Sequence, residues 1–178
     1  MKEIITERLR LRSFNLSDLK DFYEYARLET VGPNAGWTPH PSIEYSKKIL
    51  ESFIISTEVW ALELKKENKV IGSIGLHKRT IEEFGEVYEL GYVLSTFYEK
   101  QGFMTEAIGA VLNYTFNELN LEEIYVGHFL ENERSEKLIN KFNFKFIKVI
   151  NYQSRDYGLK VSKIYRLEKK DYINKGEK

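Results

Sequence analysis

The chain has 178 residues, 42% of them hydrophobic and 14% aromatic, which is enough to bury one sizeable core and predicts a single domain over residues 1–178. Its 27 Lys and Arg residues balance 27 Asp and Glu residues, so we expect neither nucleic acid nor anionic lipid as a partner. The absence of cysteine excludes a disulfide framework, a thiol nucleophile and cysteine-ligated metal sites. No run approaches the ~18 apolar residues needed to span a bilayer, so we expect a soluble, cytoplasmic protein without membrane contact.

The first predicted elements are a strand and a helix. Residues 8–12 alternate charged and apolar side chains, which is the pattern of a strand with one buried face. Ser17 is then a candidate N-cap for a helix over residues 19–26, whose apolar side chains recur at helical spacing.

A loop follows this helix. All three prolines of the chain fall between residues 31 and 41, and such a density of breakers excludes a regular element. Two interpretations stay open: a rigid linker between helices, or one wall of a substrate pocket. On the second interpretation, Trp37 and His40 are the candidate substrate-binding residues.

A helix and a hairpin come next. The helix is predicted over residues 43–56, with Ser42 as its N-cap. Residues 60–64 and 70–76 predict the two strands of the hairpin, because apolar and polar side chains alternate and polar turn residues separate the runs. The acidic residues 80–86 then predict a connection.

The following stretch has an order of elements that suits anion binding. Residues 87–94 predict a strand, residues 98–104 a glycine-bearing loop, and a helix with an apolar stripe begins near Thr105 and closes at Asn120. Free backbone N–H groups and the positive end of a helix dipole hold anions at such a turn, typically phosphate. The stretch therefore predicts a site for a phosphorylated cofactor.

The last third continues the alternation of strands and helices. A strand is predicted over residues 124–129, a short helix over 135–142, and two strands over 144–150 and 161–167. The aromatic side chains on the first of these two strands either support a homodimer or fill the core, and both interpretations stay open. The lysine-rich residues 169–178 predict a frayed tail. One core with alternating elements predicts a mixed α/β domain.

Three segments together resemble a known enzyme family. They are TERLRLRSFNLSDLKDFYEYA at residues 6–26, ELGYVLSTFYEKQGFMTEAIGAVLNYTFNELNLEEI at residues 89–124 and ENERSEKLINKFNFKFI at residues 131–147. In this order they resemble the GNAT N-acetyltransferases, and within them the RimJ/RimL-type branch that acetylates the N-termini of ribosomal proteins. The resemblance implies an α/β fold of mixed α+β type. Its central, mostly antiparallel sheet would have about six to seven strands, splayed between strands 4 and 5 and flanked by about four helices.

The resemblance also implies acetyl-CoA as co-substrate. The family motif Gln/Arg-x-x-Gly-x-Gly/Ala holds the pyrophosphate through backbone N–H groups, and only Gly102 matches it strictly. Glu99 stands where the family has Gln or Arg, Met104 replaces a small residue, and Lys100 would offset the added charge. Residues 102–107 do match the branch's own pattern, Gly-aromatic-x-Thr-Glu-Ala. The alternative interpretation is a helix-capping turn that binds no ligand.

The same resemblance implies the rest of the cofactor site. The pantetheine arm would lie along the strand that ends at Leu94, whose backbone N–H groups would polarise the thioester carbonyl. Asn132 would bind the pantetheine amide and Ser135 would stabilise the departing thiolate, unless Ser135 only caps its helix. The implied cofactor-binding residues are Tyr92, Val93, Leu94, Lys100, Gln101, Gly102, Phe103, Met104, Thr105, Asn132 and Ser135.

Glu89 is the first candidate for the catalytic base, beside Ser135 as the second catalytic residue. Glu89 lies in an apolar strand where the family often has a glutamate. Burial favours the protonated form of a carboxylate and so suits it to accept a proton near neutrality. The alternative is that Glu89 pairs with an arginine or faces solvent, in which case Glu86 and Tyr88 are the reserves.

The hypothesis from the sequence is a cytoplasmic, acetyl-CoA-dependent N-acetyltransferase. His40, His77 and His128 lie in separate regions without metal-ligand spacing, so we expect no metal. Because the chain has no cysteine, the amine would attack the thioester directly. The resemblance to the RimJ/RimL-type branch implies the N-terminal α-amine of a protein as the preferred acceptor. The alternatives are a small amine, such as a polyamine, an aminoglycoside or an amino acid, and a non-catalytic module that senses acyl-CoA.

Overall fold

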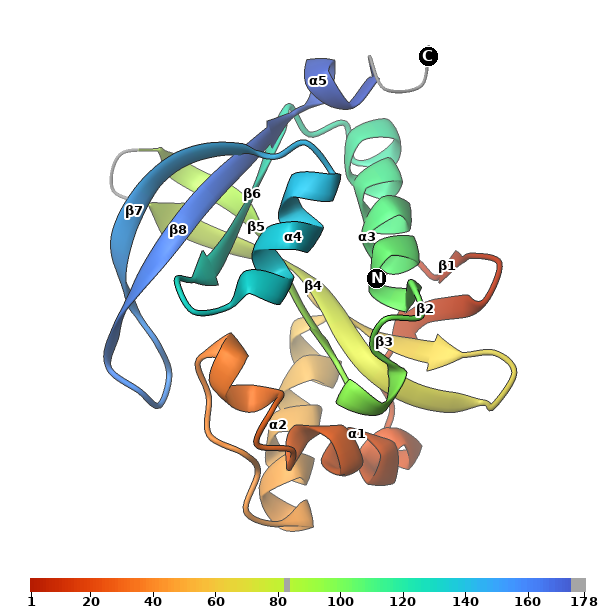
Figure 1. Cartoon of the computed structure of the whole chain (residues 1–178). Coiled ribbons are helices and arrows are strands. Elements are labelled where there is room, and N and C mark those ends of the chain that lie inside the picture. Colours follow the sequence, from red (N-terminus) through yellow and green to blue (C-terminus); the bar gives the residue numbers. More distant parts are fainter. Residues whose placement is uncertain (82–83, 174–178) are drawn as a thin grey trace.

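The computed structural model describes residues 1–81 and 84–173 (Figure 1). Eight strands in this part of the chain form one sheet in the order β1-β2-β3-β4-β5-β6-β8-β7. Neighbouring strands run antiparallel except β5 and β6, which run parallel. The strands are β1 (Ile4–Ile5), β2 (Leu9–Ser13), β3 (Val59–Leu64), β4 (Lys69–Ile81), β5 (Gly85–Leu94), β6 (Glu123–Phe129), β7 (Lys145–Gln153) and β8 (Leu159–Glu168).

The sheet confirms the predicted fold class, a mixed α/β fold around a mostly antiparallel sheet, and corrects two details. The described chain has eight strands where six or seven are expected, because the two-residue strand β1 pairs with β2. The connection expected over residues 80–86 is also too long. β4 extends to Ile81 and β5 begins at Gly85, so the two strands form one long hairpin.

Helices cover both faces of the sheet (Figure 1): α3 and α4 pack on one face, and α1 and α2 on the other. α3 continues into a π-helical turn at Tyr114–Glu118 and begins two residues before the predicted start. None of the helices in the described ranges is both long and apolar enough to cross a membrane. The α-helices of this part of the chain are α1 (Leu19–Ala26), α2 (Ile43–Ser56), α3 (Phe103–Asn113), α4 (Glu133–Lys141) and α5 (Lys169–Ile173).

The start of α1 differs from the prediction and the start of α2 agrees with it. Asn15, not Ser17, is the cap: its side-chain oxygen accepts the N–H of Ser17, and the carboxylate of Asp18 accepts the N–H of Asn15. This reciprocal pair closes a capping box on a short 3-10 turn from which α1 continues. At α2 the hydroxyl of Ser42 accepts the N–H of Tyr45, as predicted.

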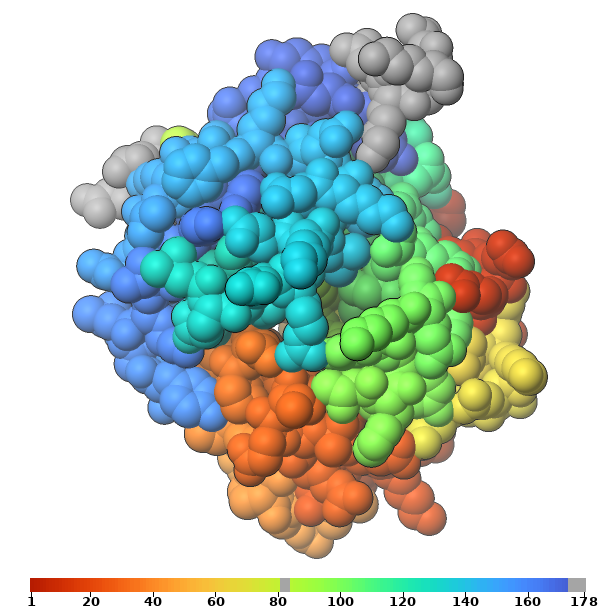
Figure 2. All heavy atoms as spheres, viewed as in Figure 1, coloured from red at the N-terminus to blue at the C-terminus, as the bar shows by residue number. Residues whose placement is uncertain are grey.

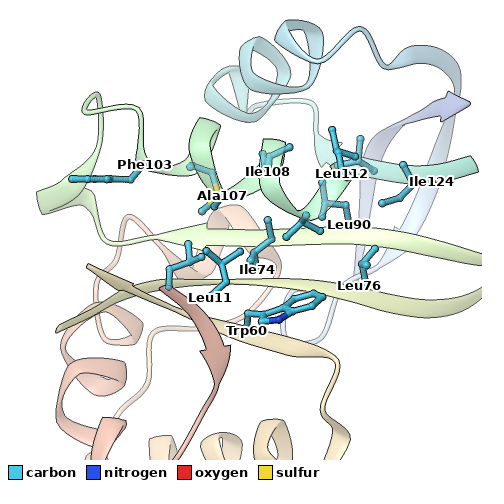
Figure 3. Close-up of a cluster of buried hydrophobic side chains, with 14 of the residues drawn as sticks. Leu11, Trp60, Ile74, Leu76, Leu90, Phe103, Ala107, Ile108, Leu112 and Ile124 are labelled. Atoms are coloured by element: carbon cyan, nitrogen blue, oxygen red, sulfur yellow. The ribbon is translucent and has the colours of Figure 1, made fainter. Parts of the chain in front are cut away.

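The largest core cluster lies between α3 and the sheet (Figure 3). Ile108 and Leu112, one helical turn apart on α3, are buried against Ile74 of β4 and Leu90 of β5. A second cluster lies on the opposite face, under α1 and α2. The middle of β5 is therefore held from both sides.

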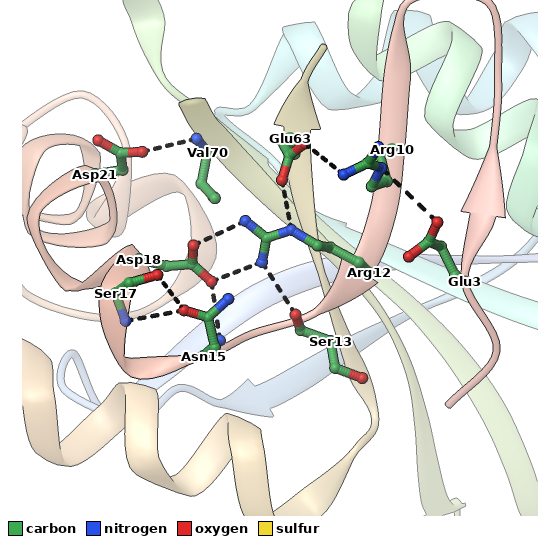
Figure 4. A network of polar contacts seen from close by, with 10 residues as sticks. All are labelled: Glu3, Arg10, Arg12, Ser13, Asn15, Ser17, Asp18, Asp21, Glu63 and Val70. Atoms are coloured by element: carbon green, nitrogen blue, oxygen red, sulfur yellow. Dashed lines mark hydrogen bonds and ion pairs between the residues drawn. The ribbon is translucent and has the colours of Figure 1, made fainter. Parts of the chain in front are cut away.

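A buried ion-pair network joins β2, β3 and the start of α1 (Figure 4). The guanidinium of Arg12 donates 2.8 Å hydrogen bonds to both carboxylate oxygens of Asp18 and another bond to Glu63. Asp18 is only 5% exposed and Glu63 6%. The hydrogen bonds that Arg12 donates to Asp18 raise the pKa of Arg12 further above its usual range, although burial opposes the rise. The network fixes the α1 end of the chain to the sheet.

The C-terminal residues correct another expectation. Residues 169–173 are not frayed but form α5. The ring of Tyr172 packs 4.9 Å from the ring of Phe116, and Asp171 pairs with Lys145 at 2.6 Å. The remainder of the expected tail, residues 174–178, lies outside the described residues. α5 therefore docks against the end of the α3 segment.

Candidate active site

A cleft opens where β5 and β6 diverge. The two strands pair at only two positions, Glu89 with Tyr125 and Leu90 with Val126. Beyond Leu90 the strands separate, which confirms the predicted splay between the fourth and fifth of the predicted strands. The cavity in and around the gap has a volume of about 840 Å³ and is lined by both strands.

The cleft passes through the sheet from one face to the other. Side chains alternate along β5, so Tyr92 and Leu94 pack in the cluster with α3, whereas Val93 packs in the cluster with α1 and α2. One mouth therefore lies beside α3 and α4, where the first part of the loop after α1 also reaches, and the other lies on the side of α1 and α2, beside Trp37 and His40. Figure 2 shows the orange loop, the cyan α4 and the green turn before α3 meeting on one face of the molecule.

The turn before α3 has the shape that the sequence predicts. Gly102 takes a left-handed conformation at φ 81°, which favours glycine, and no side chain caps the first turn of α3. Arg8 holds this turn from outside: it donates to the carbonyl of Gln101 at 2.8 Å and pairs with Glu106 at 2.6 Å. Its guanidinium also stacks 4.5 Å from the ring centre of Phe103. The first-turn N–H groups of α3 thus border the cleft without a side-chain cap.

The negative charge of Glu99 has a partner that the sequence missed. Glu99 pairs with Arg134 of α4, on the other side of the cleft mouth, rather than with the neighbouring Lys100. Arg134 also donates to the carbonyl of Thr30 in the loop after α1, at 3.5 Å. The departure from the family motif at Glu99 is therefore compensated by an ion pair across the mouth.

The start of α4 brings three of the predicted residues together. Asn132 is the N-cap, with its side-chain oxygen accepting the N–H of Ser135 at 3.1 Å, so the interpretation that Ser135 caps the helix is wrong. Asn132 also donates to the carbonyl of Asn34 at 3.3 Å. The Ser135 hydroxyl, freed from capping, lies 2.7 Å from the phenol oxygen of Tyr92.

Glu89 lies at the vertex of the diverging strands. Its side chain is 19% exposed and lines the cleft, and its carboxylate lies 3.4 Å from Nε of Arg79. Glu89 thus has the arginine partner that the alternative interpretation expected, and this arginine, Arg79, also lines the cleft. Of the two reserves, Glu86 pairs with Lys78 at 2.8 Å outside the cleft, and Tyr88 packs beside the core cluster under α3. Glu89 is the candidate base that the structure leaves in place.

The loop at residues 31–41 forms a wall of the cleft at its second mouth. Trp37 and His40 both line the cavity, with their rings 5.1 Å apart. His40 is only 4% exposed and lies 2.7 Å from the hydroxyl of Ser46 through Nδ1. Burial, together with the nearby charge of Arg155, lowers the pKa of His40 to about 4. His40 therefore offers a neutral ring to this mouth at neutral pH.

His40 should make the stability of the fold depend on pH. Its folded-state pKa of about 4 lies below the ordinary value of 6.5, so the unfolded chain takes up the proton first as pH falls. The contribution of the neutral His40 ring to the unfolding free energy is complete above pH 6.5 and is lost as pH falls toward 4. Between pH 7.5 and pH 5, we expect wild type to lose about 2 kcal/mol of unfolding free energy through this residue. Urea titrations should show a correspondingly smaller loss in His40→Gln, and an equal loss in both proteins would contradict the assignment.

The other histidines serve internal contacts. His77 lies 3.3 Å from Glu58, and His128 bonds to the carbonyl of Phe129 and to Tyr165. Across residues 1–81 and 84–173, no three His, Cys, Asp or Glu side chains come together as a metal site.

Comparisons with known proteins agree with this geometry. The model of the acetyltransferase (GNAT) domain family matches residues 8–145. The chain is 30% identical over 146 residues to the uncharacterized N-acetyltransferase YnaD of Bacillus subtilis (strain 168), which covers 80% of this chain and 82% of YnaD. A GNAT-family acetyltransferase from Bacillus anthracis superposes with a TM-score of 0.83 at 23% identity, over 95% of this chain and 99% of that one. The ribosomal-protein-S5-alanine acetyltransferase of Vibrio fischeri superposes with a TM-score of 0.75 at 18% identity, over 97% and 99%.

The divergent strands and the glycine turn before α3 are thus those of an acyltransferase fold. The chain belongs to the GNAT acetyltransferase family and is an N-acetyltransferase. The family predicted from the three sequence segments is confirmed.

Proposed function

We propose that this enzyme transfers the acetyl group of acetyl-CoA to a primary amine, and that its preferred acceptor is the N-terminal α-amine of a protein. The observation that carries the proposal is the cleft through the sheet, with the uncapped start of α3 at one mouth and Glu89 at its vertex. Bound acetyl-CoA would supply an activated thioester to this cleft.

The residues at the α3 mouth fit a diphosphate. Backbone N–H groups at an uncapped helix start attract anions, and the predicted cofactor residues from 100 to 105 all belong to this turn. Lys137 of α4 lines the same cavity and adds positive charge. The pantetheine arm would lie along the unpaired edge of β5 from Tyr92 to Leu94, where backbone N–H groups can donate to the thioester carbonyl.

The vertex of the cleft suits proton removal from the incoming amine. Glu89 lines the cleft between its two mouths, so an amine entering beside Trp37 would meet its carboxylate before the thioester. An α-amine titrates near ~8 and a lysine side chain near ~10.4. A single carboxylate therefore activates an α-amine more readily than a lysine, which supports the preference for an N-terminus.

The charges along the cleft argue against polycationic acceptors. Among the described residues that line it, the carboxylates are Glu89 and Glu99, and each is paired with an arginine. Polyamines and aminoglycosides carry further ammonium groups that need carboxylate partners in a binding site. A protein N-terminus carries one ammonium group, and the Vibrio fischeri neighbour is a ribosomal-protein-S5-alanine acetyltransferase.

A binding assay and a turnover assay together test the proposal. Acetyl-CoA and coenzyme A should raise the melting temperature, whereas ATP should raise it less. Thiol release should then be fastest with peptides that carry a free N-terminal Ala or Ser, and the same peptides with formylated N-termini should be inactive controls. If thiol release is faster with spermidine or an aminoglycoside than with the peptides, the preferred acceptor is a small amine. Stabilisation without turnover across the panel would favour the acyl-CoA-sensing alternative, and no stabilisation would overturn both.

A further inference from the structure

The side of the cleft that faces α4 contains a pair of hydroxyl groups from distant parts of the chain. Tyr92 projects from β5 toward α4, and its phenol oxygen lies 2.7 Å from Oγ of Ser135. Both residues line the cleft, and Ser135 is 9% exposed. Since the side chain of Asn132 caps α4, the hydroxyl of Ser135 is not needed to cap the helix.

Two hydroxyl groups that share one hydrogen bond use only one of their two protons in it. If Tyr92 donates to Ser135, the proton of Ser135 is left to point into the cleft. Burial raises the pKa of Tyr92 to about 12. The phenol therefore keeps its proton throughout the pH range in which an amine is acetylated.

We propose that Tyr92 is a positioning residue, which holds the Ser135 hydroxyl so that its proton faces the sulfur as the thiolate leaves. This inference rests on the proposed function. In the step concerned, a bond forms from the amine nitrogen to the carbonyl carbon and the carbon–sulfur bond breaks. The sulfur keeps the electron pair and accepts a hydrogen bond from Ser135. Glu89 has by then passed the first proton of the ammonium group to solvent, so its carboxylate accepts the second proton, which the nitrogen loses as the amide forms.

Positioning is favoured over proton donation by the relative acidities of the groups. A thiol titrates near ~8.5, several pH units below the phenol of Tyr92. Net transfer of the phenol proton to a thiolate is therefore uphill, whereas a hydrogen bond relayed through Ser135 needs no transfer. A bond to an ionised acceptor is also stronger than one between neutral groups, so the stabilisation grows as charge develops on sulfur.

The experiment is a double-mutant cycle on Tyr92→Phe and Ser135→Ala, measured with the peptide that gives the fastest thiol release. Each single variant should lower kcat by about 10-fold, and the double variant should be no slower than the slower single variant. The dissociation constant of coenzyme A, measured by calorimetry, should stay within about twofold of wild type, because the backbone contacts remain. Tyr125→Phe, whose hydroxyl bonds to Glu123 outside the cleft, is the matched control and should keep wild-type kcat.

The possible results separate this inference from the proposed function. The inference is overturned if the fold decreases in kcat of the two single variants multiply in the double variant, or if Tyr92→Phe keeps the wild-type kcat. In either case, acetyl transfer by wild type still supports the proposed function. Absence of transfer by wild type to every amine tested overturns the proposed function and the inference with it. The cycle also detects a decrease in kcat that comes from altered packing in Tyr92→Phe. Ser135→Ala already lacks the hydrogen bond, so a decrease caused by packing would still appear when Tyr92→Phe is added to it.

Discussion

Glu89→Gln should lower kcat by about 100-fold while the affinity for coenzyme A stays nearly unchanged. Gln has the shape of Glu and can still accept a hydrogen bond from Arg79, 3.4 Å away, but it cannot take a proton from the incoming ammonium. The variant must then wait for amine that is already deprotonated in solution. Its rate should therefore climb with pH up to the pKa of an α-amine, near ~8, and the gap to wild type should narrow. Steady-state rates from pH 6 to pH 9 measure this.

The matched control for this prediction is Glu86→Gln. Glu86 lies on the same strand, but its carboxylate pairs with Lys78 outside the cleft. Its pH–rate profile should match wild type. If the profiles of Glu89→Gln and wild type have the same shape, Glu89 is not the base, and a water-relayed route to solvent becomes the better mechanism.

The largest effect on stability is expected from Arg12→Ala, which should lower the unfolding free energy by about 3–5 kcal/mol. The substitution leaves the carboxylates of Asp18 and Glu63 buried without the guanidinium that bonds both. Each carboxylate then stays charged at a desolvation cost or takes up a proton. Urea unfolding at neutral pH, followed by fluorescence of the two tryptophans, measures the loss.

Arg10→Ala is the control on the same strand. Arg10 is 44% exposed and lies 3.3 Å from Glu63, which keeps its bond to Arg12 when Arg10 is removed. A partly exposed pair of this kind contributes about 1 kcal/mol or less. Equal losses for the two variants would show that the charge of β2, rather than the buried network, sets the effect.

The family segments predicted most of the fold because they lie where local pattern and long-range structure agree. The stripe on α3 repeats at helical spacing and meets a single flat surface, so its buried face follows from sequence alone. The predicted start of α1 was wrong because the local pattern alone does not determine the cap. Asn15 and Ser17 are both good caps, and the choice between them depends on Asp18, whose carboxylate closes the box and pairs with Arg12.

The candidate site was predictable where the backbone defines it and not where side chains pair across the fold. Gly102 follows from the turn pattern, and the divergence of β5 from β6 follows from the resemblance to the family. The partner of Glu99 does not, because Arg134 lies 35 residues later on another element. The bond between Tyr92 and Ser135 spans 43 residues, and nothing local to either residue signals it. Arg8, which bonds to the carbonyl of Gln101 across 93 residues, escapes prediction for the same reason.

The contacts of Arg8 with the turn before α3 bear on how the sequence of this turn can change. Its contacts reach the carbonyl of Gln101 across 93 residues of sequence and fix the turn from the outside. With the backbone fixed there, we expect that side chains at the turn can differ from the family motif, as Glu99 and Met104 do, while the turn keeps its shape. The shape of this turn thus depends on two distant parts of the chain. A sequence motif confined to the turn includes only one of them and omits Arg8.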